Sequence, residues 1–414
     1  MGLKSGYKQT EMGVIPDEWE VKTCAEICLK IQDGTHFSPT PGGKDFLYVT
    51  SKNIGFGTLD VTDANRIDAA QHRTIYKRCD VRRGDLLLTK DGANTGNAAL
   101  NTLDEEFSLL SSVALLRLDT KKHEPSFYLQ QVLSGPGQRR IKDAMSGNAI
   151  TRLTLVKIRG LRFPAAPFPE QCVIAQALGD VDAQVAAQEK LITKKRDLKQ
   201  AAMQQLLTGR TRMPGFKGMW EVKRIAEIAT PSPERNAAAE VLPVLTCSKH
   251  RGFVDSLGYF KNQVFSEDTS TYRLIRRGQI GYPANHVEEG SIGLQDLYDM
   301  ALVSPIYVVF SVNESVDSYF LHRVLKLDSY RQRFKTATTS SVDRRGSLRW
   351  PAFSEITVSI PSLPEQVAIA AALSDMDAEI AALDARLAKT RDLKQGMMQE
   401  LLTGRTRLVG RGAA

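Results

Sequence analysis

The chain has 414 residues, 42% of them hydrophobic and 25% charged, so it can hold two or three domains with their own cores and is not a disordered protein. Lys and Arg (55) exceed Asp and Glu (47), and the formal charge of +8 favours a polyanionic partner. No apolar run reaches the roughly 18 residues of a membrane helix, and the start lacks the apolar stretch of a signal peptide, so we expect a cytoplasmic protein with no membrane partner.

The first block, residues 1–167, is predicted to be a compact domain of mixed helix and strand. Short β-rich runs at 46–50, 86–89 and 113–118 alternate with turns that are rich in Gly, Asn and Asp. A helical stretch is predicted at 125–133. This alternation is typical of an α+β domain.

A long helix is predicted within the next block, residues 168–212. Pro169 and Glu170 suit the first turn of a helix, and Gly209 suits its carboxy-terminal cap. Apolar residues recur with a heptad period between these ends, and Gln188 interrupts them. The residues of this seam are Ile174, Leu178, Val181, Val185 and Ile192.

The remaining blocks repeat this order. Residues 213–361 are predicted to form a second α+β domain, with a strand at 306–310 and a helix at 315–327. Residues 362–409 form a second helical block, and 410–414 are a tail. The seam of the second helix consists of Ile369, Leu373, Met376, Ile380, Leu383 and Leu387.

An internal repeat relates the two helices. Residues 169–212 align without a gap with residues 364–407 at an offset of 195, and 27 of the 44 aligned positions are identical. Neither seam is long enough to stand alone, so we expect the helices to pair antiparallel within one chain. The predicted fold is therefore two α+β domains separated by an intramolecular antiparallel coiled coil with pseudo-twofold symmetry, and residues 1–15 should lie near residues 405–414.

At this point the sequence resembles the specificity subunits of type I restriction-modification enzymes. The resemblance rests on the two helix entries, Phe168-Pro169-Glu170-Gln171 and Leu363-Pro364-Glu365-Gln366, and on the Leu-Leu-Thr-Gly helix exits. The opening Gly-Val-Ile-Pro-Asp-Glu-Trp and the Arg-Arg-Gly-Asp-Leu-Leu stretch (82–87) also resemble that family. The second copy departs from the pattern at Gln279, where the family usually has Asp.

The resemblance implies two target-recognition domains, each reading half of an interrupted double-stranded DNA site. It also implies two helices that space the domains and dock two methyltransferase subunits, and restriction subunits through them. S-adenosylmethionine, ATP and Mg²⁺ are then expected in the partner subunits and not in this chain.

The sequence lacks the motifs of an enzyme that acts on DNA. It has no glycine-rich methyl-donor loop with an Asn-Pro-Pro-Tyr/Phe partner, and no phosphate-binding loop of a motor. Asp17, Glu20 and Lys22 are nuclease residue types, but they lie too close together to form the required hairpin. Cys24 and Cys28 have no second ligand pair, so no metal site is expected.

Two alternatives stay open beside a non-catalytic specificity subunit. One is a self-sufficient methyltransferase or endonuclease with drifted motifs. The other is a coiled-coil scaffold unrelated to DNA, which two divergent basic domains disfavour.

Loops at matching places in both domains carry the residue types that read bases and hold phosphates. Arg and Lys bind guanine, Asn and Gln bind adenine, and phosphate contacts fix position. As single loops they are equally well explained as solvated turns. The predicted DNA-binding residues are Lys52, Asn53, Lys90, Asn94, Thr95, Asn148, Thr151, Arg152, Lys249, His250, Arg251, Tyr282, Asn285, His286, Ser340, Arg344 and Arg345.

Polar identities between the two helices predict a partner-docking surface. A heptad seam tolerates apolar exchange, so pairing between the helices alone would not retain polar residues off the seam. Two equal surfaces are what two copies of one partner require. The predicted docking residues are Asp180, Asp182, Arg196, Lys199, Gln204, Asp375, Asp377, Arg391, Lys394 and Gln399.

Overall fold

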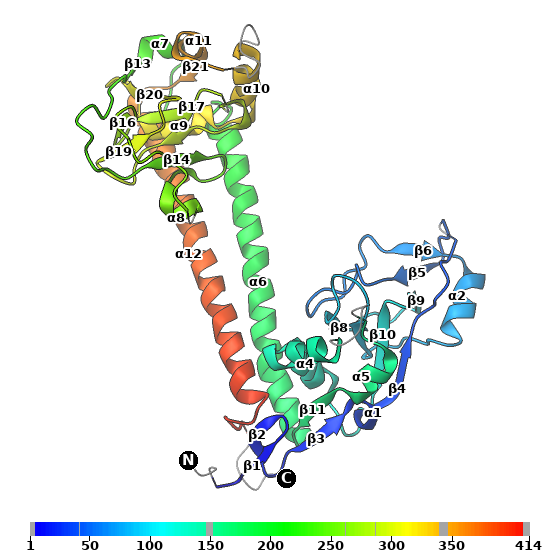
Figure 1. The fold of residues 1–414 in the computed structure, drawn as a ribbon. Coiled ribbons are helices and arrows are strands. Elements are labelled where there is room, and N and C mark those ends of the chain that lie inside the picture. The colour runs from blue at the N-terminus through cyan, green and yellow to red at the C-terminus, as the bar shows by residue number, and fades with distance from the viewer. Residues whose placement is uncertain are drawn as a thin grey trace. The chain divides into compact units, whose positions relative to one another are not determined.

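The computed structural model describes residues 5–40, 42–145, 152–260, 262–285, 287–338 and 347–408. The chain divides into two compact units, residues 1–189 with 385–414, and residues 190–384. Two helices, α6 (Phe168–Leu206) and α12 (Leu363–Leu401), run from one unit into the other (Figure 1). Each unit therefore contains one domain and one half of the helix pair. Among the described residues, no helix is both long and apolar enough to span a membrane.

A four-stranded antiparallel sheet in the order β4-β10-β7-β8 forms the centre of the first domain. Its strand β7 (Leu86–Thr89) is buried throughout because successive side chains enter different cores. Leu86 and Leu88 pack into one hydrophobic cluster and Leu87 into another. The continuous apolar run thus marks a strand covered on both faces.

The other elements of this domain surround that sheet. The predicted runs at 86–89, 113–118 and 125–133 match β7, β10 and α3, and the run at 46–50 contains β5. The elements are β1 (Tyr7–Thr10), β2 (Gly13–Pro16), β3 (Glu20–Thr23), α1 (Cys24–Ile27), β4 (Cys28–Asp33), β5 (Phe46–Val49), β6 (Asn65–Ile67), α2 (Ala69–Tyr76), β8 (Ala98–Leu100), β9 (Phe107–Leu109), β10 (Val113–Leu118), α3 (Pro125–Leu133), α4 (Gly135–Met145), α5 (Leu155–Gly160) and β11 (Arg162–Ala165).

The second domain repeats this sheet, in the order β13-β20-β17-β18. The strand predicted at 306–310 and the helix predicted at 315–327 occur as β20 and α9 with shifted ends. The elements are β12 (Glu221–Arg224), α7 (Ile225–Ile228), β13 (Ala229–Pro231), β14 (Leu245–Ser248), β15 (Gly252–Asp255), α8 (Ser256–Phe260), β16 (Arg273–Arg276), β17 (Ile280–Pro283), η1 (Val287–Glu289), β18 (Gly293–Leu294), β19 (Met300–Val303), β20 (Tyr307–Val312), α9 (Ser318–Leu325), α10 (Asp328–Ala337), α11 (Trp350–Ser354) and β21 (Thr357–Ile360).

The two helices pair antiparallel in both units, as predicted. In the first unit, Ile174 and Leu178 near the start of α6 share a core with Leu401 and Leu402 at the end of α12. In the second unit, Ile369 and Leu373 near the start of α12 share a core with the end of α6. The seam residues Ile192 and Leu387 are buried as well.

Ion pairs across the helix pair obey the pseudo-twofold repeat. Lys199 pairs with Asp377 in the second unit, and its counterpart Lys394 pairs with Asp182 in the first, with nitrogen and oxygen 2.7 Å apart in the latter pair. In the same way, Arg196 pairs with Asp384, and Arg391 pairs with Glu189. In both cases the residues of one pair are the counterparts of the residues of the other pair at the repeat offset of 195.

The repeated helix entries hold each helix onto its own domain. The amide of Gln171 donates to the Ala166 carbonyl at 2.7 Å and accepts from the backbone N–H of Glu124, just before α3. Gln366 does the same with Pro361 and Asp317, just before α9. These buried glutamines satisfy backbone groups at both sites, which explains their retention.

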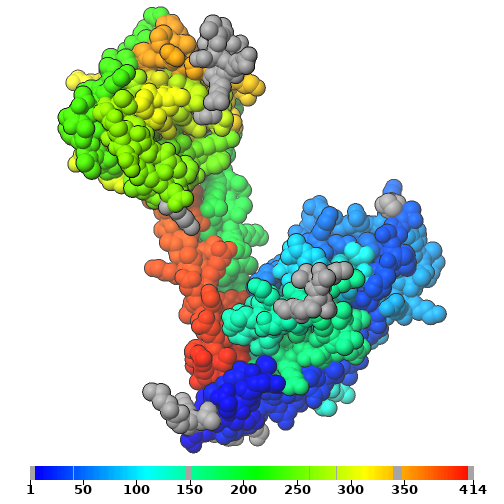
Figure 2. Space-filling model, viewed as in Figure 1, coloured from blue at the N-terminus to red at the C-terminus, as the bar shows by residue number. Residues whose placement is uncertain are grey.

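The chain ends are close together, as predicted for a nearly cyclic repeat. Gly404 ends its helix with a φ of 68°, as Gly209 does with 70°. The hydroxyl of Tyr7 in β1 donates to the Gly404 carbonyl at 3.0 Å. Figure 2 shows the blue amino-terminal segment against the red end of α12.

Candidate nucleic-acid interface

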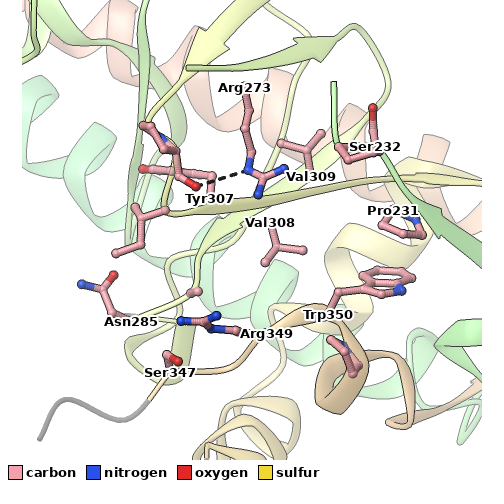
Figure 3. Close-up of a pocket in the computed structure, with 15 residues that line it drawn as sticks. Pro231, Ser232, Arg273, Asn285, Tyr307, Val308, Val309, Ser347, Arg349 and Trp350 are labelled. Carbon is pink, nitrogen blue, oxygen red and sulfur yellow. Dashed lines mark hydrogen bonds between the residues drawn. The ribbon is translucent and has the colours of Figure 1, made fainter. Parts of the chain in front are cut away.

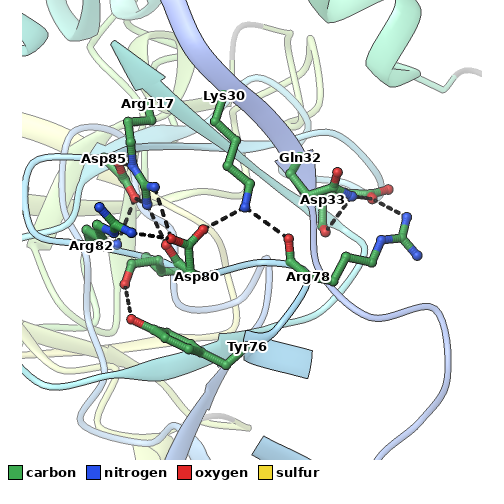
Figure 4. Close-up of polar contacts among 10 residues, drawn as sticks. Lys30, Gln32, Asp33, Tyr76, Arg78, Asp80, Arg82, Asp85 and Arg117 are labelled. Atoms are coloured by element: carbon green, nitrogen blue, oxygen red, sulfur yellow. Dashed lines mark hydrogen bonds and ion pairs between the residues drawn. The ribbon is translucent and has the colours of Figure 1, made fainter. Parts of the chain in front are cut away.

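A charged network supports the loops at one end of the central sheet in the first domain (Figure 4). Asp85 caps the turn before β7 by accepting from the N–H of Arg82 at 2.7 Å. Arg117 in β10 donates to both oxygens of Asp85, at 2.9 and 2.8 Å, and to Asp80 at 3.1 Å. Burial alone would raise the pKa of Asp80, but hydrogen bonds from Lys30 and Arg117 lower it to about 2.

The second domain builds the same turn from neutral groups. Gln279 accepts from the N–H of Arg276 at 2.7 Å and donates to the hydroxyl of Ser311 in β20 at 2.9 Å. Gln279 and Ser311 stand where the first domain has Asp85 and Arg117. The neutral Gln279 in place of an Asp is therefore accompanied by a neutral partner, Ser311, in place of an Arg.

The loop after β7 neutralises its own cations. Lys90 is only 4% exposed, and its ammonium lies 2.7 Å from Asp91 and 3.6 Å from Asp33. Arg152 also binds Asp91, at 2.9 Å, although its own side chain is exposed. The prediction that Lys90 contacts DNA is wrong for this conformation because two carboxylates enclose its charge, whereas Arg152 remains accessible.

The two predicted DNA-binding residues in the loop after β5 differ in their exposure to solvent. Asn53 is buried and accepts from the N–H of Thr50 at 2.9 Å while it donates to the Asp60 carbonyl at 3.1 Å. Asn53 therefore shapes its turn and is not available to a base, which corrects the prediction. Lys52 beside it is exposed.

The other predicted residues of the first domain lie in exposed loops where they are described. Asn94 is exposed, and the hydroxyl of Thr95 donates to the Gly92 carbonyl at 2.7 Å within the same turn. Asn148 and Thr151 lie outside the described residues.

In the second domain, the prediction for Tyr282 is wrong. Its side chain is 0% exposed and packs with its ring centroid 4.6 Å from that of Phe353. The tyrosine belongs to the core because β17 is buried along its length. Lys249, His250 and Arg251 are exposed in the turn between β14 and β15. His286, Ser340, Arg344 and Arg345 lie outside the described residues.

Asn285 borders a hollow of about 770 Å³ that also includes two arginines the sequence did not reveal (Figure 3). These are Arg273 in β16 and Arg349 at the start of α11. One signal could have found Arg349. The N–H of Leu348 donates to the Ala284 carbonyl, just as the N–H of Leu153 donates to the Lys90 carbonyl. Aligning these two leucines shows that Leu348 follows the predicted DNA-binding residues Arg344 and Arg345 as Leu153 follows Arg152, and Arg349 comes next in the chain.

Most of the predicted docking residues serve the helix pair itself. The sequence predicts that pairing of the helices does not require these polar identities. However, six of these residues form the ion pairs across the helices that are described above. One of them, Asp377, also pairs with Arg323 in α9. These six are Asp182, Arg196, Lys199, Asp377, Arg391 and Lys394.

The remaining four predicted docking residues are exposed, and their role stays a prediction. They are Asp180, Gln204, Asp375 and Gln399. Asp180 accepts from Gln176 of its own helix at 2.7 Å.

No group of three or more His, Cys, Asp or Glu among the described residues has the geometry of a metal site. Of the nuclease-like residues, Glu20 and Lys22 lie on β3, where they pair with each other at 2.9 Å, whereas Asp17 lies in the turn before that strand. Glu221 and Lys223 on β12 pair in the same way at 2.8 Å. All five cysteines are free thiols.

Comparisons with known proteins agree with this arrangement. Residues 218–389 match the family model described as "Type I restriction modification DNA specificity domain". A putative type I restriction enzyme MjaX specificity subunit of Methanocaldococcus jannaschii is 23% identical, with 98% of this chain and 97% of that protein covered. The MjaVIII specificity subunit of the same organism is also 23% identical over 98% and 97% of the two chains.

Solved structures share the fold. The S subunit of a type I restriction-modification system from M. genitalium superposes with a TM-score of 0.56 at 16% identity, over 97% of this chain and 98% of that chain. A chain from a structure of type I system assembly and conformational transition gives 0.53, also at 16% identity, over 95% and 99%.

Proposed function

Because this chain is similar along nearly its whole length to specificity subunits of type I restriction-modification systems, we propose that it is such a subunit and that it chooses the DNA sequence for its complex by reading a bipartite, interrupted site. One observation carries the bipartite part of the proposal. Each unit contains a four-stranded sheet with the same strand order and its own set of loops. Two equivalent readers on one chain suit two half-sites with an unread spacer between them.

Exposed or half-buried polar side chains on these loops are the proposed DNA contacts. In the first domain they are Lys52, Asn94, Thr95 and Arg152, and in the second they are Lys249, His250, Arg251 and Asn285. Lysines and arginines among them would neutralise phosphates, so binding should weaken as salt rises. The net charge of +8 supports this mode of binding.

The proposal makes this chain a non-catalytic subunit that acts in the cytoplasm. S-adenosylmethionine, ATP and Mg²⁺ would be bound by methyltransferase and restriction subunits. The test uses the purified chain with a methyl donor or divalent metal and a DNA substrate. We expect neither methylation nor cleavage, and either activity would favour the self-sufficient enzyme instead.

The central experiment for this function is a genome-wide map of methylated adenines in a host with and without the gene. We expect one interrupted motif to lose methylation when the gene is deleted. An unchanged methylation pattern in an otherwise active system would contradict the proposed function.

We also propose that the helix pair docks two methyltransferase subunits at two equivalent surfaces. Six of the polar identities serve the helix pair, so the docking surface is proposed on residues that this pairing does not use. Leu198 is 48% exposed and its counterpart Leu393 is 58% exposed, although a leucine on a solvated face has no reason to be retained. An identical lysine stands one turn before each, Lys194 and Lys389.

Substitution of both leucines tests the docking surface. Leu198→Glu with Leu393→Glu should lower the number of bound methyltransferase copies from two toward zero in native mass spectrometry. Leu191→Glu is the matched control, because Leu191 is 41% exposed on the same helix but has Arg386 as its counterpart. Retention of both copies by the double variant would contradict this surface.

A further inference from the structure

The hollow in the second domain has rigid walls and a cationic lining. Strand β20 contributes Tyr307, Val308 and Val309, and four prolines stand around the rim. Proline fixes its own backbone φ, so such walls change little when a ligand arrives. The prolines are Pro231, Pro233, Pro305 and Pro351.

No described residue that lines the hollow is acidic, yet two arginines are present. Arg273 donates to the Pro305 carbonyl at 3.2 Å, which fixes its position and leaves its charge uncompensated by that bond. Burial and the neighbouring Arg235 lower the pKa of Arg273. Arg235 and Arg273 are joined by a β-bridge, so positive charge accumulates at this side of the hollow.

Arg349 and Asn285 are two long polar side chains of the hollow whose hydrogen-bonding groups are free. Among the described residues neither makes a side-chain hydrogen bond or ion pair, and Arg349 does not cap the helix that it begins. Figure 3 shows the guanidinium of Arg349 extending toward Asn285, with Val308 between these residues and Arg273. Two different donors that converge over an apolar floor form a surface suited to a planar, polar edge.

In the first domain, ion pairs occupy the position that is equivalent to Asn285. By the shared hydrogen bonds of Leu153 and Leu348, Lys90 corresponds to Ala284 and Asp91 corresponds to Asn285. Asp91 is occupied by Lys90 and Arg152. In the second domain the lysine has become alanine and the carboxylate an amide, which opens the site and removes its negative charge.

We propose that Asn285 and Arg349 are base-reading residues of the second domain, with Asn285 recognising an adenine and Arg349 a guanine in the half-site. This inference rests on the proposed function and adds the residues and bases that carry half of the specificity. An Asn amide can bond adenine N6 and N7 at once, and an Arg guanidinium can bond guanine O6 and N7. Arg273, held by its backbone contact, would instead lie near a phosphate.

The test is selection of DNA from a random duplex library by the full chain, assembled with its methyltransferase subunits, followed by sequencing. Asn285→Ala should lose the preference for one A·T pair, and Arg349→Ala the preference for one G·C pair, each by about 5- to 150-fold. Both losses should fall within the same half-site. The other half-site should stay unchanged.

Two further variants keep the inference testable if Arg349→Ala fails to fold. Arg349→Lys preserves the charge but not the bidentate geometry, so affinity should persist while the G·C preference falls. Lys217→Ala removes one positive charge from an exposed residue outside the hollow and should leave every preference intact.

The outcomes separate this inference from the proposed function. A wild-type chain that selects an interrupted site, together with Asn285 and Arg349 variants that select the same site unchanged, would overturn only the inference. A uniform loss of affinity without a change of motif would make both residues phosphate contacts and would overturn it too. A wild-type complex without any sequence preference would overturn the proposed function and this inference with it.

Discussion

The first and second domains share one frame but hold it together with different chemistry. Where the first domain joins Asp85 to Arg117 as an ion pair, the second joins Gln279 to Ser311 through neutral groups. The turn that both pairs support has the same positive φ at its glycine, 86° at Gly84 and 84° at Gly278. The geometry of the turn has therefore been preserved while its charges were exchanged as a pair.

The same contrast recurs in the loop that follows β7 in the first domain and β17 in the second. In the first domain, Lys90 and Arg152 are neutralised by Asp91. In the second, Asn285 and Arg349 have no such carboxylate beside them in the hollow. The two domains thus differ at a place where DNA contact is proposed, so one frame can present two different surfaces.

The largest effect expected from this contrast concerns Arg117. Arg117→Met leaves the carboxylate of Asp85, which is 3% exposed, without its cation, and should destabilise the first domain by about 3–5 kcal/mol. Ser311→Ala at the equivalent position removes one neutral hydrogen bond and should cost about 0.5–1.5 kcal/mol. Hydrogen exchange in increasing urea resolves the two domains. Equal losses of stability in the two variants would contradict the proposed difference between the ion pair and the neutral hydrogen bond.

Acid should affect the first domain before the second. Asp80 has a folded pKa of about 2, below its ordinary value of 3.8, and the pKa of Asp91 is lowered as well. A carboxylate with a lowered folded pKa contributes stability that is complete above its unfolded pKa and is lost as pH falls through the folded value. The second domain has Gln279 and Asn285 where the first has Asp85 and Asp91.

We therefore expect the first domain to lose hydrogen-exchange protection between about pH 4 and pH 2 while the second domain keeps more of its own. Measurement by mass spectrometry assigns the loss to peptides of each domain. Earlier loss in the second domain would contradict the assignment of this charge network to the first.

The two halves of the helix seam provide a smaller test. Gln188 is buried, and both of its polar side-chain atoms lack a hydrogen-bond partner in the described structure, whereas its counterpart is Leu383. An unsatisfied buried amide is unfavourable, so Gln188→Leu should stabilise the chain by about 1–2 kcal/mol. Leu383→Gln should have the opposite sign. Thermal unfolding measures both, and destabilisation by Gln188→Leu would indicate a partner for the amide.

Elements with a strong local signal could be predicted from the sequence. The apolar run at 86–89 and Pro125 at the start of a helix gave the correct bounds because burial on both faces and the first-turn proline are local properties. The antiparallel pairing could be predicted because neither of the two repeated apolar seams is long enough to stand alone. The offset relates the ion pair of Asp182 and Lys394 to that of Asp377 and Lys199, but which residues face each other across the helices depends on the register of the helix pair, which the offset does not give.

The candidate site was harder to predict because residue type does not reveal burial. Asn53 and Lys90 are typical of DNA-binding loops, yet turn geometry occupies the first and two carboxylates enclose the second. Tyr282 belongs to the stretch Tyr-Pro-Ala-Asn, whose composition is typical of a loop, but this stretch begins inside a buried strand. Arg273 joins the hollow from β16, far from Asn285 in the sequence, and no local pattern indicates that contact.

Exchange of one domain tests most directly the claim that each domain reads its own half-site. Residues 213–361 would be replaced by the corresponding residues of a relative with a known motif, and methylated adenines would be mapped in a host that carries the exchanged chain. The account predicts that one half-site takes the relative's sequence while the other half-site stays as it was. A change in both half-sites, or in neither, would contradict it.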